Sequence, residues 1–144
     1  VDQLIAFRDK LGGSQAALPG AENATASRAE KAYAEVEKAP WVVGPGSDDT
    51  PYIYMFMNVT CGECQQTWKA LESAQASGKL RIRLLPFGAV KENRDGGAAL
   101  LSSENPAKAW SDFIAGDKSA LDPAKAVPGS REAVDFNTEL IKKW

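Results

Sequence analysis

The two cysteines of the chain, Cys61 and Cys64, are its only residues of that type and stand three positions apart. The thiolate form of cysteine is the nucleophile in thiol–disulfide exchange and is also a good metal ligand. A pair at this spacing can therefore be a redox-active pair, half of a metal site or a small structural disulfide. The other residues of the sequence help to decide among these three uses.

A metal site fits the sequence least well. Zinc and iron–sulfur sites need about four ligands, and the chain has no further cysteine and no histidine. The same lack of histidine excludes a Ser-His-Asp triad. Gln65 stands where haem attachment requires a histidine after the second cysteine. We therefore expect no metal and no organic cofactor. A structural disulfide stays open as an alternative, although closing so small a loop constrains the unfolded chain little.

The bulk composition is that of an ordinary soluble globular domain. The chain has 144 residues, of which 44% are hydrophobic and 25% charged. Its net charge of −2 does not indicate nucleic acid or an anionic membrane as a partner. No stretch approaches the roughly 20 apolar residues of a membrane span. The first residues do not form a signal-peptide pattern, so we expect a cytosolic protein or the mature form of an exported one.

The cysteine pair falls between a predicted strand and a predicted helix. The run Tyr52–Asn58 (YIYMFMN) is apolar at both alternating sets of positions, which predicts a strand buried on both faces. Residues 62–77 have helical periodicity, with Trp68 on the apolar face. Residues 80–86 alternate and predict a second strand. Strand, helix and strand form a βαβ unit, whose two strands should be parallel.

The remaining segments predict helices around this unit. We divide the chain into an N-terminal helix and linker at 1–26 and a catalytic domain at 27–144. Before the unit, the patterns predict a helix at 1–11, a linker at 12–26, a helix from the capping box Ser27-Arg28-Ala29-Glu30 to Lys38, and a strand at Trp41–Val43. After it, they predict a helix from about 97, another from Pro106, a loop at 120–129 and a last helix at 130–144.

This placement gives the two cysteines different chemical roles. Cys61 comes at the N-terminus of the predicted helix, where unpaired backbone N–H groups and the macrodipole favour negative charge. A thiolate at Cys61 would be stabilised there, and the pKa of its thiol lowered. Cys64 lies one turn later on the same face and closer to the core. We expect Cys61 to attack a partner sulfur and Cys64 to resolve the mixed disulfide.

The residues beside the cysteines are expected to tune this chemistry. Gly62 allows close approach of a partner backbone, since it carries no side chain. Glu63 places a negative charge beside the thiolate and should oppose part of the helix effect. We therefore expect a less acidic Cys61 and a weaker oxidant than a neutral residue at position 63 would give. Thr60, directly before Cys61, completes the set of expected redox-tuning residues.

Several stretches around the pair resemble one protein family. From Ala29 to its end, the chain resembles the catalytic domain of periplasmic disulfide isomerases of the DsbC/DsbG type in the thioredoxin superfamily, and it is closer to DsbG. The likeness is carried by Trp41 at the first strand, by YIYMFMNVTCGECQQTW and SGKLRIRLLPFGAV around the βαβ unit, and by NPAKAW at 105–110. The flanking stretches narrow the family, because all thioredoxin-like proteins share the CxxC motif.

The resemblance implies an α/β thioredoxin-like fold with a helical insertion and a periplasmic location. It also implies thiol–disulfide exchange on exported proteins, as isomerase or reductase, with Cys61 attacking and Cys64 resolving. Such proteins also reduce cysteines oxidised to sulfenic acid, and a membrane thiol reductase supplies their electrons. A homodimer is one option. Two alternatives stay open: an oxidase that donates its disulfide, and a non-catalytic thioredoxin-like chaperone or binding module whose cysteines form a structural disulfide.

The sequence departs from the family in two respects. Gly62-Glu63 replaces the aromatic-containing dipeptide usual between the cysteines. In addition, the family has a threonine–cis-proline turn facing the cysteines, then two antiparallel strands and a final helix. Neither Pro123 nor Pro128 is followed by a strand pattern, and we count three strands where the family has five. We expect this C-terminal part to be missing from the chain, which would leave the strand at 52–58 with an exposed edge.

Overall fold

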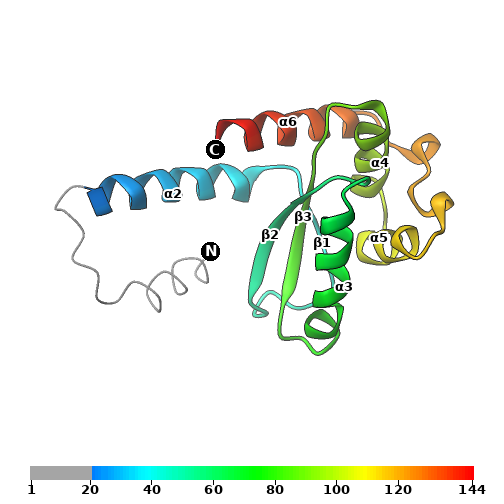
Figure 1. Ribbon diagram of the computed structural model, residues 1–144, viewed down its shortest axis with the longest axis horizontal. Helices are drawn as coiled ribbons and strands as arrows, with labels where there is room; N and C mark the ends of the chain where they lie inside the picture. Colours follow the sequence, from blue (N-terminus) through cyan, green and yellow to red (C-terminus); the bar gives the residue numbers. More distant parts are fainter. Residues whose placement is uncertain (1–20) are drawn as a thin grey trace.

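The computed structural model describes residues 21–144, so the helix expected at 1–11 and most of the linker expected at 12–26 lie outside the described residues. The elements follow in the order α2 (Ala21–Lys38), β1 (Val42–Val43), β2 (Tyr52–Met57), α3 (Gly62–Ala76), β3 (Arg81–Pro86), α4 (Lys91–Leu101), α5 (Pro106–Ile114), the 3₁₀ turns η1 (Lys118–Leu121) and η2 (Pro123–Lys125), and α6 (Ser130–Lys143). In Figure 1, α3 runs alongside β2 and β3 on the side where α4 and α5 lie, and α2 extends away on the other side.

The predicted βαβ unit is confirmed. Strands β2 and β3 are parallel, with Tyr52 opposite Arg81 and Met57 opposite Pro86, and helix α3 connects them. The short strand β1 pairs antiparallel with the other side of β3, so the sheet order is β1-β3-β2. In residues 21–144 there are three strands and no cis peptide bond. As expected, the cis-proline turn and the two further strands of the family are not among the described residues, and β2 is an edge strand.

The central strand of the core is β3, and the expectation that Tyr52–Asn58 is buried on both faces is wrong. Only Met57 of β2 is fully buried, and the other residues of this strand are half-buried. In β3, by contrast, Ile82, Leu84 and Leu85 are all buried. The physical reason is the strand order, since β3 has a neighbour on each side and β2 has one on only one side. An apolar run predicts a strand well but does not reveal its place in the sheet.

The apolar residues of β3 divide between the two faces of the sheet. Ile82 and Leu84 belong to the main core, together with Trp68 of α3, Trp110 of α5 and Leu100 of α4. Trp68 is 2% exposed, and its indole N–H donates a hydrogen bond of 2.9 Å to Ser111 Oγ of α5. The inward position predicted for Trp68 is thus confirmed. The apolar face of α3 thereby holds this helix, which begins next to the cysteines, against the core.

Helix α6 covers the other face through one buried amide. Asn137 is fully buried, and its Nδ2 donates hydrogen bonds to the carbonyl oxygens of Pro40, at 2.8 Å, and Pro86, at 3.0 Å. Leu140 packs beside it against Ala39 and Leu85. Neither proline carbonyl has a strand partner, so the Asn137 amide satisfies two backbone acceptors that burial would otherwise leave unpaired. This contact connects α6 to the ends of α2 and β3.

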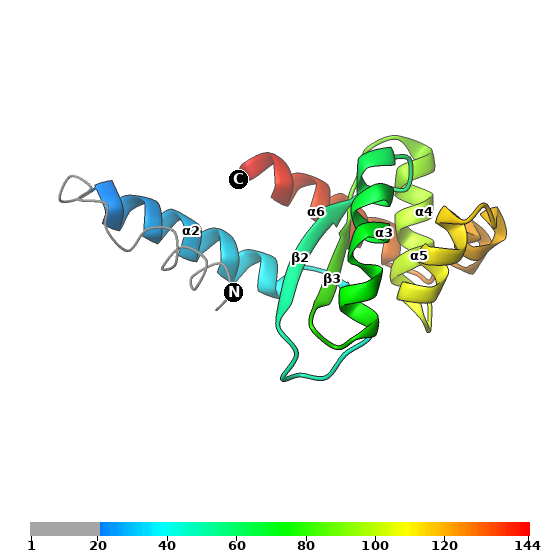
Figure 2. The same cartoon turned by 60° about the horizontal axis from the view of Figure 1, so that its bottom comes forward.

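Two boundaries on the N-terminal side differ from the sequence predictions. Helix α2 begins at Ala21 and runs through the expected capping box, so Ser27 is not its N-cap. Figure 2 shows α2 projecting from the sheet as one long helix. Strand β1 begins at Val42 instead of Trp41, because the Trp41 indole N–H donates to the carbonyl of Glu37 and closes the end of α2. None of the helices in residues 21–144 has the length and apolar character needed to span a bilayer.

Helix α4 begins at Lys91, six residues before the predicted start at 97. Its first turns carry charged and polar side chains that hide the apolar periodicity, and two glycines follow. A Cβ atom on Gly96 would come within 2.8 Å of Val59, and one on Gly97 within 2.9 Å of Pro86 and 3.0 Å of Val134. Real Cβ atoms essentially never approach another non-bonded atom more closely than 3.0 Å. The glycines therefore let α4 pack directly on the end of β3 and on the loop after β2.

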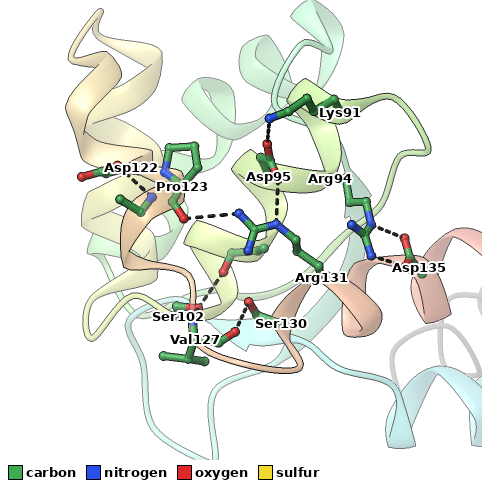
Figure 3. A network of polar contacts seen from close by, with 12 residues as sticks. Lys91, Arg94, Asp95, Ser102, Asp122, Pro123, Val127, Ser130, Arg131 and Asp135 are labelled. Atoms are coloured by element: carbon green, nitrogen blue, oxygen red, sulfur yellow. Dashed lines mark hydrogen bonds and ion pairs between the residues drawn. The ribbon is translucent and has the colours of Figure 1, made fainter.

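Ion pairs connect α4 to α6 on the outer side of this contact (Figure 3). The Asp95 carboxylate, which belongs to a residue only 8% exposed, accepts from Lys91 and, at 2.7 Å, from Arg131 Nε. Arg94 donates two bonds of 2.8 Å to the carboxylate of Asp135. Hydrogen bonds from Lys91 and Arg131 lower the pKa of Asp95, and Arg94 lowers the pKa of Asp135. These pairs satisfy the carboxylate of Asp95, the charged residue that is buried in the first turns of α4.

Replacing Gly97 by alanine should destabilise the fold. The added methyl group would press on Pro86 and Val134, and overpacking of this kind costs about 1–3 kcal/mol. Gly62→Ala is the matched control, since nothing lies within 4 Å of a Cβ there and alanine favours a helix. Urea unfolding of the oxidised protein measures both variants. Equal stability of the two variants would show that α4 does not depend on this close approach.

Acid should weaken the contact between α4 and α6. Because the folded-state pKa of Asp95 is lowered, its contribution to stability is present above the unfolded pKa and is lost as pH falls through the folded pKa. We expect the free energy of unfolding to decrease between neutral pH and about pH 3. Asp95→Asn should lower stability at neutral pH and flatten this decrease. Asp49→Asn, at an exposed position without an ion pair in residues 21–144, should leave the pH dependence unchanged.

Candidate functional site

The two cysteines lie at the junction of β2 and α3, as predicted. Strand β2 ends at Met57, and α3 begins at Gly62 with Cys61 as its N-cap residue. Cys61 has extended backbone angles (φ −79°, ψ 103°), and its Sγ accepts a hydrogen bond of 3.1 Å from the backbone N–H of Cys64. The two sulfurs are bonded to each other, and the Cα atoms are 5.2 Å apart. The Cys61 sulfur thus occupies the place of a helix-capping acceptor.

The residues around Cys61 are open to solvent, whereas Cys64 faces the core. Thr60, Gly62 and Glu63 are exposed and Cys61 is half-buried. No atom lies within 4 Å of a Cβ built on Gly62. Cys64 packs against the main core cluster. The five residues proposed from the sequence are consecutive in the chain and lie together at this junction, where Cys61 and Cys64 are both half-buried and Cys64 contacts the core cluster.

Three sets of hydrogen bonds fix the loop that carries Cys61. The backbone N–H of Cys61 donates a hydrogen bond of 3.2 Å to the carbonyl of Asn58, and Gln65 Nε2 donates one of 3.1 Å to the carbonyl of Val59. The third set comes from α4, where Asn93 Oδ1 accepts both the backbone N–H of Thr60, at 3.1 Å, and its hydroxyl, at 3.0 Å. These bonds connect the loop to the two helices on either side of it.

Sequence reasoning did not find Asn93. Its position lies 32 residues after Cys61, in a segment where the helix was expected to begin only at 97. The structure buries it to 7% exposure in the first turns of α4. The available signal was a neutral amide among the charged residues before Gly96-Gly97, but that signal does not identify its partner. A hydrogen bond over this separation follows only from the three-dimensional fold.

No group of three or more histidine, cysteine, aspartate or glutamate side chains in residues 21–144 is placed to hold a metal ion. A cavity of about 590 Å³ lies at the other end of α3, between Gly44, Trp68, Gln75 and Arg81. It does not include either cysteine. The half-buried cysteine pair therefore lies apart from this cavity, with the exposed residues Thr60, Gly62 and Glu63 beside it.

A second cluster of polar and aromatic side chains lies at the start of β2, away from the cysteines. The guanidinium carbon of Arg83 lies 3.7 Å from the ring centre of Tyr52 and 4.4 Å from that of Trp41. The guanidinium also donates a hydrogen bond of 2.8 Å to the hydroxyl of Tyr54. Tyr33 of α2 shares a hydrogen bond of 3.0 Å with Tyr52. Burial, followed by these hydrogen bonds, raises the pKa of Tyr33, so its hydroxyl stays neutral. The cluster therefore anchors α2 to the sheet.

Comparisons with known proteins agree with this geometry. No protein-family model matches the chain. The chain is 28% identical over 117 residues to the thiol:disulfide interchange protein DsbG of Pseudomonas aeruginosa, covering 79% of this chain and 46% of that protein. It is 30% identical over 112 residues to DsbG of Escherichia coli, covering 76% of this chain and 45% of that protein. The chain thus spans about half the length of the curated relatives it matches.

Solved structures agree on the fold. The catalytic domain of Proteus mirabilis ScsC matches with a TM-score of 0.61 at 18% identity, covering 78% of each chain. ScsC in a compact conformation matches with a TM-score of 0.59 at 20% identity, covering 99% of this chain and 73% of that one. At this identity the likeness concerns the fold alone, whereas the two sequence matches point to DsbG. Together the comparisons support a DsbG-like protein with a thioredoxin-like fold.

Proposed function

We propose that the chain is a thiol–disulfide oxidoreductase in which Cys61 is the attacking and Cys64 the resolving cysteine. One observation carries the proposal: the Cys61 sulfur is the N-cap acceptor of α3 and receives the backbone N–H of Cys64. In the reduced protein the same N–H and the positive end of the helix dipole would stabilise a thiolate at this sulfur. The exposure of the neighbouring Gly62 gives a partner access to it.

The first step is attack of the Cys61 thiolate on one sulfur of a substrate disulfide. A bond forms between Cys61 Sγ and that sulfur, the substrate S–S bond breaks, and the other substrate sulfur leaves as a thiolate. The Cys64 thiolate then attacks Cys61 Sγ and releases the second substrate thiolate. The substrate has gained two electrons, and the enzyme has become the Cys61–Cys64 disulfide. The Cα separation of 5.2 Å shows that the backbone holds the two cysteines close enough for this bond.

Two other outcomes use the same mixed disulfide. If a second substrate thiolate attacks it before Cys64 does, the substrate is isomerised and the Cys61 thiolate leaves, with no net transfer of electrons. If the substrate carries a sulfenic acid, attack by Cys61 forms the same mixed disulfide and releases water after protonation. Cys64 then completes the reduction. Isomerase and reductase are thus two fates of one intermediate, and we propose both for this site.

The proposed substrates are exported proteins with disulfides or oxidised cysteines, and the proposed location is the periplasm. The support is the likeness to two proteins named as thiol:disulfide interchange proteins. A membrane thiol reductase would restore the dithiol, because reduction of a substrate consumes it. The surface position of Cys61 supports a protein substrate, since the cysteine pair does not border the large cavity at the other end of α3.

A trapping experiment tests the proposed roles. Cys64→Ser should leave Cys61 able to form a mixed disulfide but unable to release it, so disulfide-bonded partners should accumulate. Cys61→Ser is the matched control and should trap none. Non-reducing electrophoresis and mass spectrometry of the recovered complexes measure this. Equal, empty traps from both variants would favour the alternative of a non-catalytic binding module with a structural disulfide.

The charge at position 63 should set the oxidising strength of the pair. Replacing Glu63 by glutamine removes a negative charge two residues from Cys61, which should lower the pKa of the Cys61 thiol and make the pair more oxidising. The thiol pKa is measured by the pH dependence of alkylation, and the potential by equilibration with glutathione. Glu72→Gln, at an exposed site farther along α3, is the control. A Glu63→Gln protein with the thiol pKa and potential of the unaltered chain would contradict the tuning role.

A further inference from the structure

We propose that Asn93 of α4 is a positioning residue for Cys61 and that it acts through Thr60. The inference rests on the proposed function, because it concerns the geometry of the same cysteine pair. Its basis is the double hydrogen bond by which a single buried oxygen, Asn93 Oδ1, accepts both the backbone N–H and the hydroxyl of the residue before Cys61.

These contacts fix Thr60 through its main chain and its side chain together. The two bonds to Asn93 Oδ1 measure 3.1 Å and 3.0 Å, and the Thr60 hydroxyl also lies 3.2 Å from Asn58 Oδ1. Thr60 itself is exposed, whereas Asn93 is buried. A solvent-exposed residue in a short loop would ordinarily exchange its hydrogen bonds with water. Here a buried acceptor holds it in one conformation.

The conformation of Thr60 matters because Cys61 must keep its N-cap geometry. The sulfur receives the Cys64 N–H only while Cys61 holds extended backbone angles directly before the first helical residue, Gly62. Rotation of the peptide between residues 60 and 61 would turn the sulfur away from that donor. Stabilisation of a thiolate by a helix N-terminus falls off within the first turn. Fixing Thr60 therefore keeps the sulfur where the stabilising groups can reach it.

Asn93 is itself held in place from two sides. Gly88 has a φ of +141°, and a Cβ on it would come within 2.5 Å of the Asn93 Cβ, so only glycine allows this approach. The backbone N–H of Gly88 donates 2.9 Å to Thr138 Oγ1 of α6. One turn further along α4, Gly96 packs on Val59 of the cysteine loop. The position of Asn93 thus depends on α4 and α6, and these two helices take part in shaping the redox site.

The test replaces Asn93 by leucine, which has a similar volume but no hydrogen-bond acceptor. In the reduced protein we expect alkylation of Cys61 at neutral pH to slow by about three- to tenfold, with the pH profile displaced upward. Amide exchange of Thr60, followed by NMR, should accelerate because its acceptor is gone. Both are measured on the full chain, and neither requires a substrate.

Asp95→Ala is the matched control on the same helix. It removes the ion pairs with Lys91 and Arg131 and should lower thermal stability, but Asp95 has no hydrogen bond to the cysteine loop. If Asn93 supports only the fold, both variants lose stability and neither changes the alkylation profile. That result would overturn the proposal, as would an unchanged Thr60 exchange rate in Asn93→Leu.

A double-mutant cycle adds a second, milder variant at an exposed position. Thr60→Val removes the hydroxyl bond but keeps the N–H bond to Asn93, so it should slow alkylation less than Asn93→Leu does. Added to Asn93→Leu, it should slow alkylation less than it does alone, because the contact shared with Asn93 is already lost and only the 3.2 Å contact with Asn58 is left to remove. Fully additive effects would show that the two residues act independently and would contradict the proposal. Lack of exchange activity in the unaltered chain would refute the proposed function alone, since these readouts follow the thiol itself.

Discussion

The close packing of α4 against the ends of the parallel strands is the constraint on which the rest of this structure depends. Gly96 and Gly97 remove side-chain volume where α4 meets Val59, Pro86 and Val134. With a larger residue at either position, the helix or the side chains of Val59, Pro86 and Val134 would have to shift. The same approach brings the polar first turns of α4 to the cysteine loop on one side and to α6 on the other. One pair of glycines thus joins the βαβ unit to the inserted helices.

The chemistry of the cysteine pair follows from ordinary helix capping. A helix leaves its first N–H groups without partners, and serine, threonine, asparagine or aspartate usually supply the accepting atom. Cys61 takes this place with sulfur, which can carry a full negative charge once it is reduced. The preceding strand ends at the loop, and Trp68 fixes the helix on the core. The strand–helix junction therefore supplies the groups that would stabilise a Cys61 thiolate, and the surrounding contacts determine how well that junction is held.

Much of this arrangement could be predicted from the sequence, for reasons that are local. The parallel βαβ unit follows from the apolar run before the cysteines, the helical periodicity after them and the alternation around Ile82, and Pro106 correctly marks the start of α5. The start of α4 could not be predicted, because its buried residues Asn93 and Asp95 are polar and bond to Thr60 and to Arg131 of α6 instead of showing an apolar face. The exposed edge expected for the strand at 52–58 is present in the described residues, whereas its expected burial on both faces is not, because an apolar run does not reveal how many neighbours a strand has.

Glu63 and Asn93 would act on the same sulfur by different physics, and this difference separates them. Glu63 is exposed and acts by charge, so salt should weaken its effect over a Debye length of about 8 Å at physiological ionic strength. Asn93 is neutral and buried and acts by geometry, which salt does not screen. The reactivity of the Cys61 thiol should therefore depend on salt only while Glu63 is present. Its dependence on Asn93 should persist at high salt, so the two residues would tune the thiol independently. Glu63, being exposed, can be substituted without disturbing the fold, whereas Asn93 is constrained by the packing of α4.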